Sequence, residues 1–430
     1  MKRTRILDLP TCKEGSEVQI SGWVDGVRAL GKIAFLSIRD GTGTVQAVAK
    51  PTTSGWDLVE ELSLETAISL RGILKKDERA LGGVEIKATQ LSIIAPSAPD
   101  YPIQPKEHST GFLMSQRHLW IRRPLQASLL RIRSTVILAA QNHLDSLGYV
   151  RVDAPILTPT SCEGTTTLFK LDYFEKTAYL TQSGQLYNEA TAHALDRVYC
   201  FGPTFRAEKS KTRKHLTEFW MLEPEAVGLG LEENISLQES LFCALIDGVL
   251  DAHEEELERR FKRDLRALKI CQRPFPRMTF AEASSRLSSL GFPLDEEGDF
   301  GAQHEEELAK DVGRPFFVHH FPAAAKAFYM APDPLDPSLS LSLDLIAPDG
   351  GGEITGGGVR IQDPNLLARR MDEEGLNRDD FSWYTDLRKY GGVQTGGFGM
   401  GIERMVRWLT GTHHVRETIP FPRTIDRLSP

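Results

Sequence analysis

The chain has 430 residues, of which 40% are hydrophobic and 26% are charged, as in an ordinary soluble globular protein. Its formal net charge of −8 argues mildly against nucleic acid as a partner but does not exclude one, because phosphate binding depends on a local basic patch. The five cysteines lack CxxC spacing and no segment has the apolar length of a signal peptide or a membrane span, which disfavours zinc, disulfides and a membrane and predicts a cytoplasmic protein.

The first 97 residues are predicted to form an all-β domain. Five apolar-rich segments, several with period-two alternation, are separated by glycine-rich or charged turns: 18–24, 33–39, 44–49, 67–74 and 84–94. Five short strands in about 100 residues are typical of a small barrel, for which the oligonucleotide-binding (OB) fold is the leading candidate. Four prolines between positions 95 and 105 then predict an extended, stiff linker, and we place the linker or hinge at residues 98–123.

Residues 124–430 are predicted to form a second domain of mixed structure. Apolar residues at helical spacing follow Pro124, and a second helical stretch runs over 233–268. Strand-like segments lie at 149–152, 178–180, 198–205, 217–225, 344–345, 353–361 and 398–399. Strands and helices without regular βαβ alternation predict an α+β domain built on an antiparallel sheet.

The segment 201–225, FGPTFRAEKSKTRKHLTEFWMLEPE, carries the densest set of chemical groups. It reads as a strand ending in Arg206 and Glu208, a basic loop, and a second strand that brings Phe219, Glu223 and Glu225. A nucleoside triphosphate needs such a set: cations for the phosphates, an aromatic face for the base, and carboxylates for a metal or an amine. A charged hairpin on a solvated surface would have the same charge run.

Two glycine-rich segments near the C-terminus could complete a nucleotide site. GGFGMGIER (396–404) precedes a helical pattern, and Arg404 at the helix start could face a ligand. Asp344 and Glu353, on neighbouring strands, could hold magnesium together with substrate phosphates. Each segment taken alone is also compatible with a structural turn or bulge. The chain has no GxxxxGK[ST] P-loop, so ATP would have to bind on an antiparallel sheet.

Together these segments resemble, in order, the three motifs of class II aminoacyl-tRNA synthetases. The helix with Arg131 and Arg133, ending near Pro155, is similar to motif 1, the dimer-forming element; FRAE with the loop to Phe219 is similar to motif 2, and GMGIER to motif 3. With the barrel in front, the chain resembles the aspartate/asparagine/lysine subgroup. YLTQSGQLYNEA (179–190) and the tail HVRETIPFPR (414–423) resemble the asparaginyl members. Aspartyl enzymes typically carry Lys at the position of Asn188, so Asn188 favours a neutral carboxamide.

The resemblance implies an ATP-dependent enzyme with Mg²⁺ as cofactor, which activates L-asparagine, transfers it to tRNA(Asn) and works as a homodimer. Arg206 would clamp the α-phosphate, Phe219 and Arg404 would sandwich the adenine, and Arg206, Arg404 and Glu353 would be the catalytic residues. Glu208 would contact adenine or metal-bound groups, and Arg213 and His215 would hold the outer phosphates. The metal would be held by Asp344 and Glu353. The amino acid would be bound by Glu163, Gln185, Asn188, Glu223 and Arg360, with Glu223 accepting from the carboxamide nitrogen and Arg360 donating to the side-chain oxygen.

In the barrel, the resemblance implies that Arg28, Phe35 and Gln46 read the anticodon, with Phe35 stacking on a splayed base and Gln46 reading a base edge. Taken from the sequence alone, without the resemblance, Phe35 is better explained as a residue of the barrel core.

Three positions near the amino-acid pocket depart from the family pattern. Thr395 stands where His is usual, Val359 where Gln is usual, and Gly358 where asparaginyl enzymes often have Ser. These departures keep alternatives open: an aspartyl enzyme of relaxed tRNA choice, an asparagine synthetase-like enzyme that amidates aspartate through an adenylate, or amino-acid activation outside translation. A silent RNA-binding paralog conflicts with the retention of Arg206, Glu353 and Arg404 together.

Overall fold

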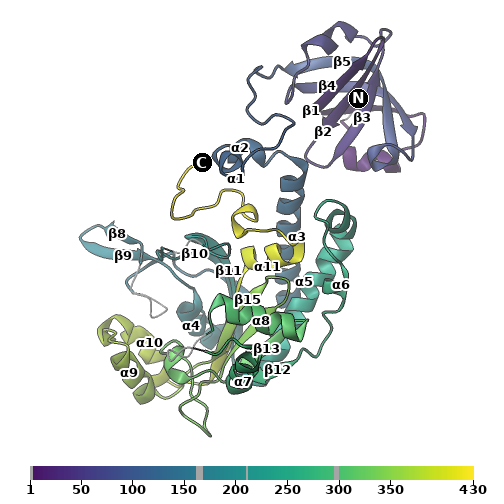
Figure 1. The fold of residues 1–430 in the computed structure, drawn as a ribbon. Helices are drawn as coiled ribbons and strands as arrows, with labels where there is room; N and C mark the ends of the chain where they lie inside the picture. The colour runs from purple at the N-terminus through teal and green to yellow at the C-terminus, as the bar shows by residue number, and fades with distance from the viewer. Residues whose placement is uncertain (1–2, 161–167, 210–211, 295–299) are drawn as a thin grey trace. The chain divides into compact units, whose positions relative to one another are not determined.

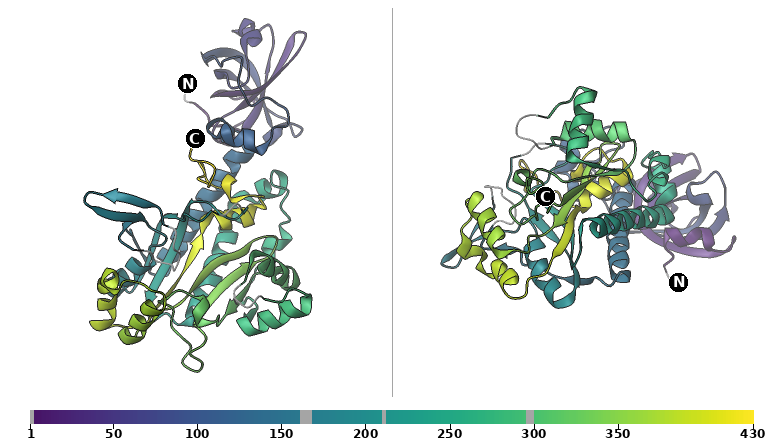
Figure 2. Two further views of the ribbon diagram at one scale, coloured as in Figure 1. Left: turned by 60° about the vertical axis from the view of Figure 1, so that its left-hand side comes forward. Right: turned by 90° about the horizontal axis from the view of Figure 1, so that it is seen from below.

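The computed structural model describes residues 3–160, 168–209, 212–294 and 300–430. By the contacts between residues, the chain divides into two compact units, 1–127 together with Pro430, and 128–429. Figure 1 shows the elements of both units, and Figure 2 gives two further views. No helix in these described ranges is long and apolar enough to cross a membrane.

The first unit contains a closed five-stranded barrel in the order β1-β2-β3-β5-β4. Its strands are β1 (Glu17–Leu30), β2 (Ile33–Arg39), β3 (Thr44–Ala49), β4 (Ala67–Lys76) and β5 (Val84–Ala95), and β3 and β5 are the parallel pair. The five predicted strands and the OB-fold barrel are thereby confirmed. The first strand runs six residues past its predicted end, because β1 pairs with β2 as far as the turn, where Leu30 faces Ile33. Short 3-10 helices lie at η1 (Ile6–Thr11), η2 (Trp56–Glu61) and η3 (Leu81–Gly83).

The predicted linker, 98–123, is not extended throughout. It contains two short helices, α1 (Thr110–Ser115) and α2 (Arg117–Trp120), and it belongs to the first compact unit. Ser109 caps α1 by accepting from the backbone N–H of Phe112. Ile103, Met114 and Trp120 form a small buried cluster. The proline-rich part predicted to be extended has no regular structure, and the exact bounds of the domains stay a prediction.

The second unit is built on an eight-stranded sheet in the order β12-β13-β14-β15-β16-β11-β10-β6. The six inner strands pair antiparallel, and each edge strand pairs parallel with its neighbour, so the sheet is mixed and the predicted α+β class is confirmed. The strands are β6 (Val150–Val152), β10 (Arg197–Phe205), β11 (Glu218–Val227), β12 (Arg277–Thr279), β13 (Phe316–His319), β14 (Ser342–Ala347), β15 (Gly352–Val359) and β16 (Thr395–Gly401).

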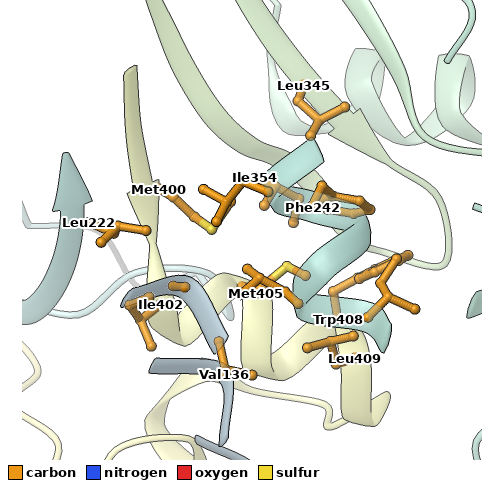
Figure 3. Close-up of a cluster of buried hydrophobic side chains, with 14 of the residues drawn as sticks. Val136, Leu222, Phe242, Leu345, Ile354, Met400, Ile402, Met405, Trp408 and Leu409 are labelled. Carbon is orange, nitrogen blue, oxygen red and sulfur yellow. The ribbon is translucent and has the colours of Figure 1, made fainter. Parts of the chain in front are cut away.

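Three helices pack on one face of this sheet: α3 (Pro124–Ser146), α5 (Leu231–Arg259) and α11 (Ile402–Thr410). Figure 3 shows how Leu222 and Met400 of the sheet meet Phe242 of α5 and Met405 of α11 in the main hydrophobic core. These side chains alternate along their strands with residues of the opposite face. The opposite face is therefore available for polar groups and glycines.

The remaining elements surround the sheet. A small sheet in the order β7-β9-β8 consists of β7 (Leu157–Thr158), β8 (Lys170–Tyr173) and β9 (Lys176–Leu180). The helices are α4 (Gln185–Leu195), α6 (Arg266–Lys269), α7 (Phe280–Leu290), α8 (Ala302–Val312), η4 (Ala323–Ala325), α9 (Pro364–Glu373), η5 (Arg378–Phe381), α10 (Ser382–Lys389) and η6 (Val415–Glu417). The helix predicted over 233–268 is wrong in its extent: α5 ends at Arg259, and the chain turns at Lys262, whose φ of 54° is left-handed.

Candidate active site

The site lies on the sheet face opposite the three helices, where polar residues of one strand face glycines of the next. Phe219, Met221, Glu223 and Glu225 alternate along β11. On the neighbouring β16, Gly401 pairs with Met221 and Gly397 pairs with Glu225. A Cβ atom at Gly397 would lie 2.2 Å from Oε2 of Glu225. The glycines of β16 therefore make room for the side chains of β11.

A first pocket joins the predicted nucleotide-binding residues. It is lined by Arg206, Lys214, His215, Leu216, Phe219, Met221, Glu353, Ile354, Gly399, Gly401, Glu403, Arg404 and Val415. The Arg206 guanidinium lies 5.7 Å from the centre of the Phe219 ring. Nη1 of Arg404 donates to the main-chain oxygen of Glu353 at 3.0 Å and to its Oε2 at 3.3 Å. Segments more than 190 residues apart in the chain thus meet in one pocket.

The cations of this pocket control the charge of Glu353 and His215. Burial alone would raise the pKa of Glu353, but Arg404, Lys326 and Arg206 together hold that pKa below its ordinary value. Burial, Arg404 and Arg206 lower the pKa of His215. At neutral pH the pocket therefore offers an ionised carboxylate, a neutral imidazole and two guanidinium groups.

A second pocket adjoins the first and contains the predicted amino-acid residues Gln185, Glu223 and Arg360 together with Asp344. Arg206, Met221, Glu353 and Gly399 line both pockets. The predicted phosphate clamp and one predicted metal ligand therefore stand at the junction of the two pockets.

Arg360 is held at its place by a carboxylate that the predicted site did not include. Its Nε and Nη2 donate to the two carboxylate oxygens of Glu225 at 2.9 and 2.8 Å. The two side chains are only 3% and 1% exposed. The alternation along the strand put Glu225 on the same face as Glu223. Its pairing with Arg360, however, is visible only in the fold.

Glu223 and Asn188 are both engaged within the protein. Glu223 accepts from Ser183 Oγ and, at 2.9 Å, from the backbone N–H of Gly184. Asn188 donates through Nδ2 to the main-chain oxygen of Glu223 at 2.8 Å. Among the described residues that line the second pocket Asn188 does not occur, so its predicted contact with the amino acid would be indirect.

Asp344 and Glu353 lie on the paired strands β14 and β15, as predicted, over one glycine. A register shift between Leu345 and Ile346 brings them together, and a Cβ at Gly356 would lie 3.0 Å from Oε1 of Glu353 and 3.1 Å from Oδ1 of Asp344. Lys326 Nζ contacts Oδ2 of Asp344 at 2.8 Å. The described residues contain no group of three or more His, Cys, Asp or Glu side chains fit for a metal. Two carboxylates suit Mg²⁺ where substrate oxygens and water supply the other ligands.

Three predicted site residues, Glu208, Arg213 and Glu163, are not among the described residues that line the two pockets. The strand β10 ends at Phe205, before Arg206 and Glu208, so the prediction that these two residues end the strand is wrong; Glu208 lies in the following loop. Arg213 is exposed, and neither it nor Glu208 is among the described residues that line the two pockets. Glu163 lies outside the described residues.

The three departures from the family pattern are buried or enclosed. Thr395 donates to Oε2 of Glu189 at 3.2 Å, and Val359 is 2% exposed. A Cβ at Gly358 would lie 2.6 Å from the main-chain oxygen of Leu341, so glycine is required there. None of the three adds a charge to the pocket.

In the barrel, Arg28, Phe35 and Gln46 lie on the outside. Phe35 is half-buried between the buried residues Ala34 and Leu36, which excludes it from the barrel core. Arg28 faces Phe35 across the β1–β2 pair. Gln46, on β3, donates through Nε2 to Glu85 at 2.8 Å. The three residues therefore present an aromatic, a cation and an amide on adjacent strands.

The comparisons with known proteins agree with this geometry. The family described as tRNA synthetases class II (D, K and N) matches residues 109–425, and the OB-fold nucleic acid binding domain matches residues 18–94. The asparagine–tRNA ligase of Pelotomaculum thermopropionicum is 50% identical over 97% of each chain. The asparaginyl-tRNA synthetase of Pyrococcus horikoshii, crystallised with asparaginyl-adenylate, superposes with a TM-score of 0.96 at 41% identity, covering all of both chains.

An aspartyl-tRNA synthetase from Entamoeba histolytica is less similar, with a TM-score of 0.84 at 27% identity over the whole of this chain and 93% of the other. The matches to asparagine enzymes thus extend over the full length of both units and at higher identity. The chain belongs to the asparagine–tRNA ligases, within the class II aminoacyl-tRNA synthetases.

Proposed function

We propose that this chain activates L-asparagine with ATP and transfers it to tRNA(Asn). In the first step an oxygen of the asparagine carboxylate bonds to the α-phosphorus of ATP, and pyrophosphate leaves. In the second step a hydroxyl of the 3′-terminal ribose of tRNA bonds to the carbonyl carbon of asparaginyl-adenylate, and AMP leaves. No covalent intermediate with the enzyme is needed, so catalysis is alignment plus electrostatic stabilisation.

The observation that carries this proposal is the shared wall of the two pockets. Arg206 lines both the pocket of Phe219 and Arg404 and the pocket of Gln185 and Arg360. With adenine between Phe219 and Arg404, the α-phosphate would lie near Arg206, and the amino-acid carboxylate would approach it from the second pocket. A guanidinium at that point stabilises the negative charge that develops on the phosphoryl oxygens.

The side-chain end of the second pocket favours a neutral carboxamide. Above pH 7, where Glu225 is ionised, it neutralises Arg360 through two hydrogen bonds, both shorter than 3.0 Å. A carboxamide oxygen can accept from Arg360 while its nitrogen donates to a carboxylate. An aspartate carboxylate would instead meet the charge of Glu225. Glu223 would accept from the carboxamide nitrogen, Gln185 would accept from the α-ammonium group, and Glu163 and Asn188 would complete the amino-acid site.

On the nucleotide side, Arg213, His215 and Glu208 are the proposed contacts for the outer phosphates and the adenine. Asp344 and Glu353 would hold Mg²⁺, which supplies charge neutralisation to the triphosphate when it is bound. Lys326 contacts Asp344 and Arg404 contacts Glu353, and these contacts orient the two carboxylates before substrates arrive.

The anticodon would be read by the barrel, and this can be tested apart from the chemistry. Base stacking on an aromatic side chain contributes about 1–3 kcal/mol per base. We expect Phe35→Ala to weaken tRNA(Asn) binding by about 5-fold to 150-fold and to leave asparagine-dependent pyrophosphate exchange unchanged. Filter binding measures the first effect, with Ile94→Ala, an exposed apolar residue of β5, as the matched control. Equal binding by the Phe35 and Ile94 variants would contradict the anticodon role.

A homodimer in the cytoplasm completes the proposal. Arg131 and Arg133 of the motif 1 helix form ion pairs with Glu256 and Glu403 of the same chain, so these two arginines do not need a second subunit to pair with. Large apolar side chains nearby in sequence are more than a third exposed: Leu138, Leu147, Val150, Ile156 and Leu157. Such exposure supports an interface with a second copy. Light scattering should give twice the chain mass of 48.0 kDa, and a monomer would refute this part.

The main test is amino-acid-dependent exchange between pyrophosphate and ATP in the presence of Mg²⁺. Asparagine, aspartate and a blank without amino acid are compared, and charging of tRNA(Asn) follows. We expect exchange with asparagine alone and charging of tRNA(Asn). Exchange with aspartate would overturn the carboxamide argument and favour an aspartyl or amidating enzyme; activation without charging would place the product outside translation.

A further inference from the structure

A fully buried carboxylate, Glu189, lies directly behind the amino-acid pocket. It is on α4, one turn after Gln185, and its side chain has no exposed surface. Four side chains donate to it: Gln185 through Nε2, Tyr384 through its hydroxyl, Arg388 through Nη2, and Thr395 through Oγ1. A buried charge is stable in such a place only when it is paired and hydrogen-bonded in this way.

This arrangement fixes the orientation of the Gln185 side chain. A carboxylate can only accept hydrogen bonds, so the atom of Gln185 that contacts Glu189 is the amide nitrogen. The group that Gln185 can present to the second pocket, which it lines, is therefore its carbonyl oxygen. A carbonyl oxygen accepts from an ammonium group, whereas an amide nitrogen would repel one.

The other members of the cluster keep Glu189 an acceptor. Arg388 carries the compensating charge and is itself held, because its Nε donates to the main-chain oxygen of Ile361 at 2.9 Å. Burial and the adjacent Glu189 raise the pKa of Tyr384 well above its ordinary value, so the phenol keeps the proton that it donates. The cluster joins α4, α10 and β16, and both α4 and β16 contribute residues that line the pocket.

We propose that Glu189 is a positioning residue for amino-acid activation, which holds the Gln185 carbonyl oxygen toward the pocket as an acceptor for the α-ammonium group of the substrate. This inference rests on the proposed function. Glu189 does not touch the substrate, and it acts on the amine end of the amino acid through its hydrogen bond with Gln185.

The test compares two ligands that differ only in that amine. Asparagine is the substrate of pyrophosphate exchange, and succinamate, its analogue without the α-amino group, is the competitive inhibitor. In Glu189→Gln the residue at 189 can also donate, so Gln185 is free to turn its nitrogen toward the pocket. We expect the KM for asparagine to rise about tenfold or more, and the KM for ATP and the inhibition constant of succinamate to change less than twofold.

Glu239→Gln is the matched control. Glu239 is a buried glutamate of α5 that accepts from the backbone N–H of Phe275, away from both pockets. This variant should keep the wild-type KM for asparagine. Equal losses for asparagine and succinamate in Glu189→Gln would overturn the proposal, since they would indicate a general distortion of the pocket, and an unchanged KM for asparagine would overturn it as well.

Glu189→Gln leaves Arg388 as a buried charge without its carboxylate, so a second variant guards against failure to fold. The double variant Glu189→Gln/Arg388→Met removes both charges, and we expect the same amine-selective loss. A double variant with the wild-type KM for asparagine would refute the positioning role. Absence of asparagine-dependent exchange in the wild-type protein would instead refute the proposed function, so the two failures are distinguishable.

Discussion

The two pockets on the sheet hold their charges in different ways. In the pocket that we assign to ATP, the side chains of Arg404 and Glu353 are 27% and 38% exposed and lie 3.3 Å apart at their closest charged atoms. In the pocket that we assign to the amino acid, Arg360 and Glu225 are 3% and 1% exposed and form two short hydrogen bonds. The nucleotide groups are therefore available to a highly charged ligand, whereas the amino-acid groups are organised before any ligand binds.

The difference follows from what each ligand brings. A triphosphate carries several negative charges and can itself satisfy the cations that face it. An asparagine side chain is neutral and small, so a cation that recognises it must be neutralised by the protein. The exposed charges should therefore matter for activity and little for folding, and the buried pairs should matter for folding as well.

The largest effect on folding is expected for Arg360→Leu. This change leaves Glu225 buried without its partner, and breaking such a pair destabilises a protein by about 3–5 kcal/mol. Arg404→Leu is the comparison, and because that pair is partly exposed we expect a loss of about 1 kcal/mol or less. Urea unfolding followed by circular dichroism measures both. Similar losses for the two variants would contradict the distinction between the pockets.

At Arg206, by contrast, a substitution is expected to lower activity and to leave folding nearly unchanged. Arg206→Ala should lower kcat for pyrophosphate exchange by about 10²–10³-fold, because it removes a donor to the charge that develops at the α-phosphate. Its free energy of unfolding should stay within about 0.5 kcal/mol of wild type if the main function of Arg206 is toward a ligand. Arg197→Ala is the control that should keep full exchange, since Arg197 is an exposed arginine at the start of β10, the strand that ends just before Arg206. Equal exchange by both variants would remove Arg206 from the mechanism.

The nucleotide pocket was easier to predict from the sequence than the amino-acid pocket. The nucleotide side was predictable because its residues stand within short contiguous motifs, as Arg206 and Phe219 do in 201–225 and Arg404 does in 396–404. The barrel was predictable because its strands alternate regularly between buried and half-buried residues.

The helix α4 was not predicted, although it carries Gln185 and Glu189. Its buried positions include Gln185, Asn188 and Glu189, so the inward face is polar and gives no hydrophobic period. The buried pairs at and behind the amino-acid pocket join residues that are distant in sequence: Glu225 is 135 residues from Arg360, and Glu189 is 199 residues from Arg388. A pattern in a single sequence does not encode such pairings, which depend on the order of the strands and on where α10 packs.

The buried pair should also be visible in the pH dependence of stability. Burial raises the pKa of Glu225 to about 7 despite the neighbouring Arg360, from an ordinary value near 4.5. The folded state therefore binds this proton more tightly than the unfolded state, and the contribution to stability is complete below pH 4.5 and is lost as the pH rises to about 7. Glu225→Gln removes the titrating group, so its free energy of unfolding should fall less between pH 4.5 and 7 than that of wild type.

The difference between the free energies of unfolding of wild type and Glu225→Gln reports on Glu225 and not on the other buried acids. Glu403, for example, also has a raised pKa because of its burial, and it titrates in both proteins. Unfolding curves at pH 5, 6 and 7 in one buffer series are sufficient, and Glu218→Gln, a change on the same strand, corrects for the loss of one charge. Parallel pH profiles for wild type and Glu225→Gln would mean that Arg360 keeps Glu225 ionised throughout, and the amino-acid pocket would then present a permanent ion pair to its substrate, as the nucleotide pocket does with Arg404 and Glu353.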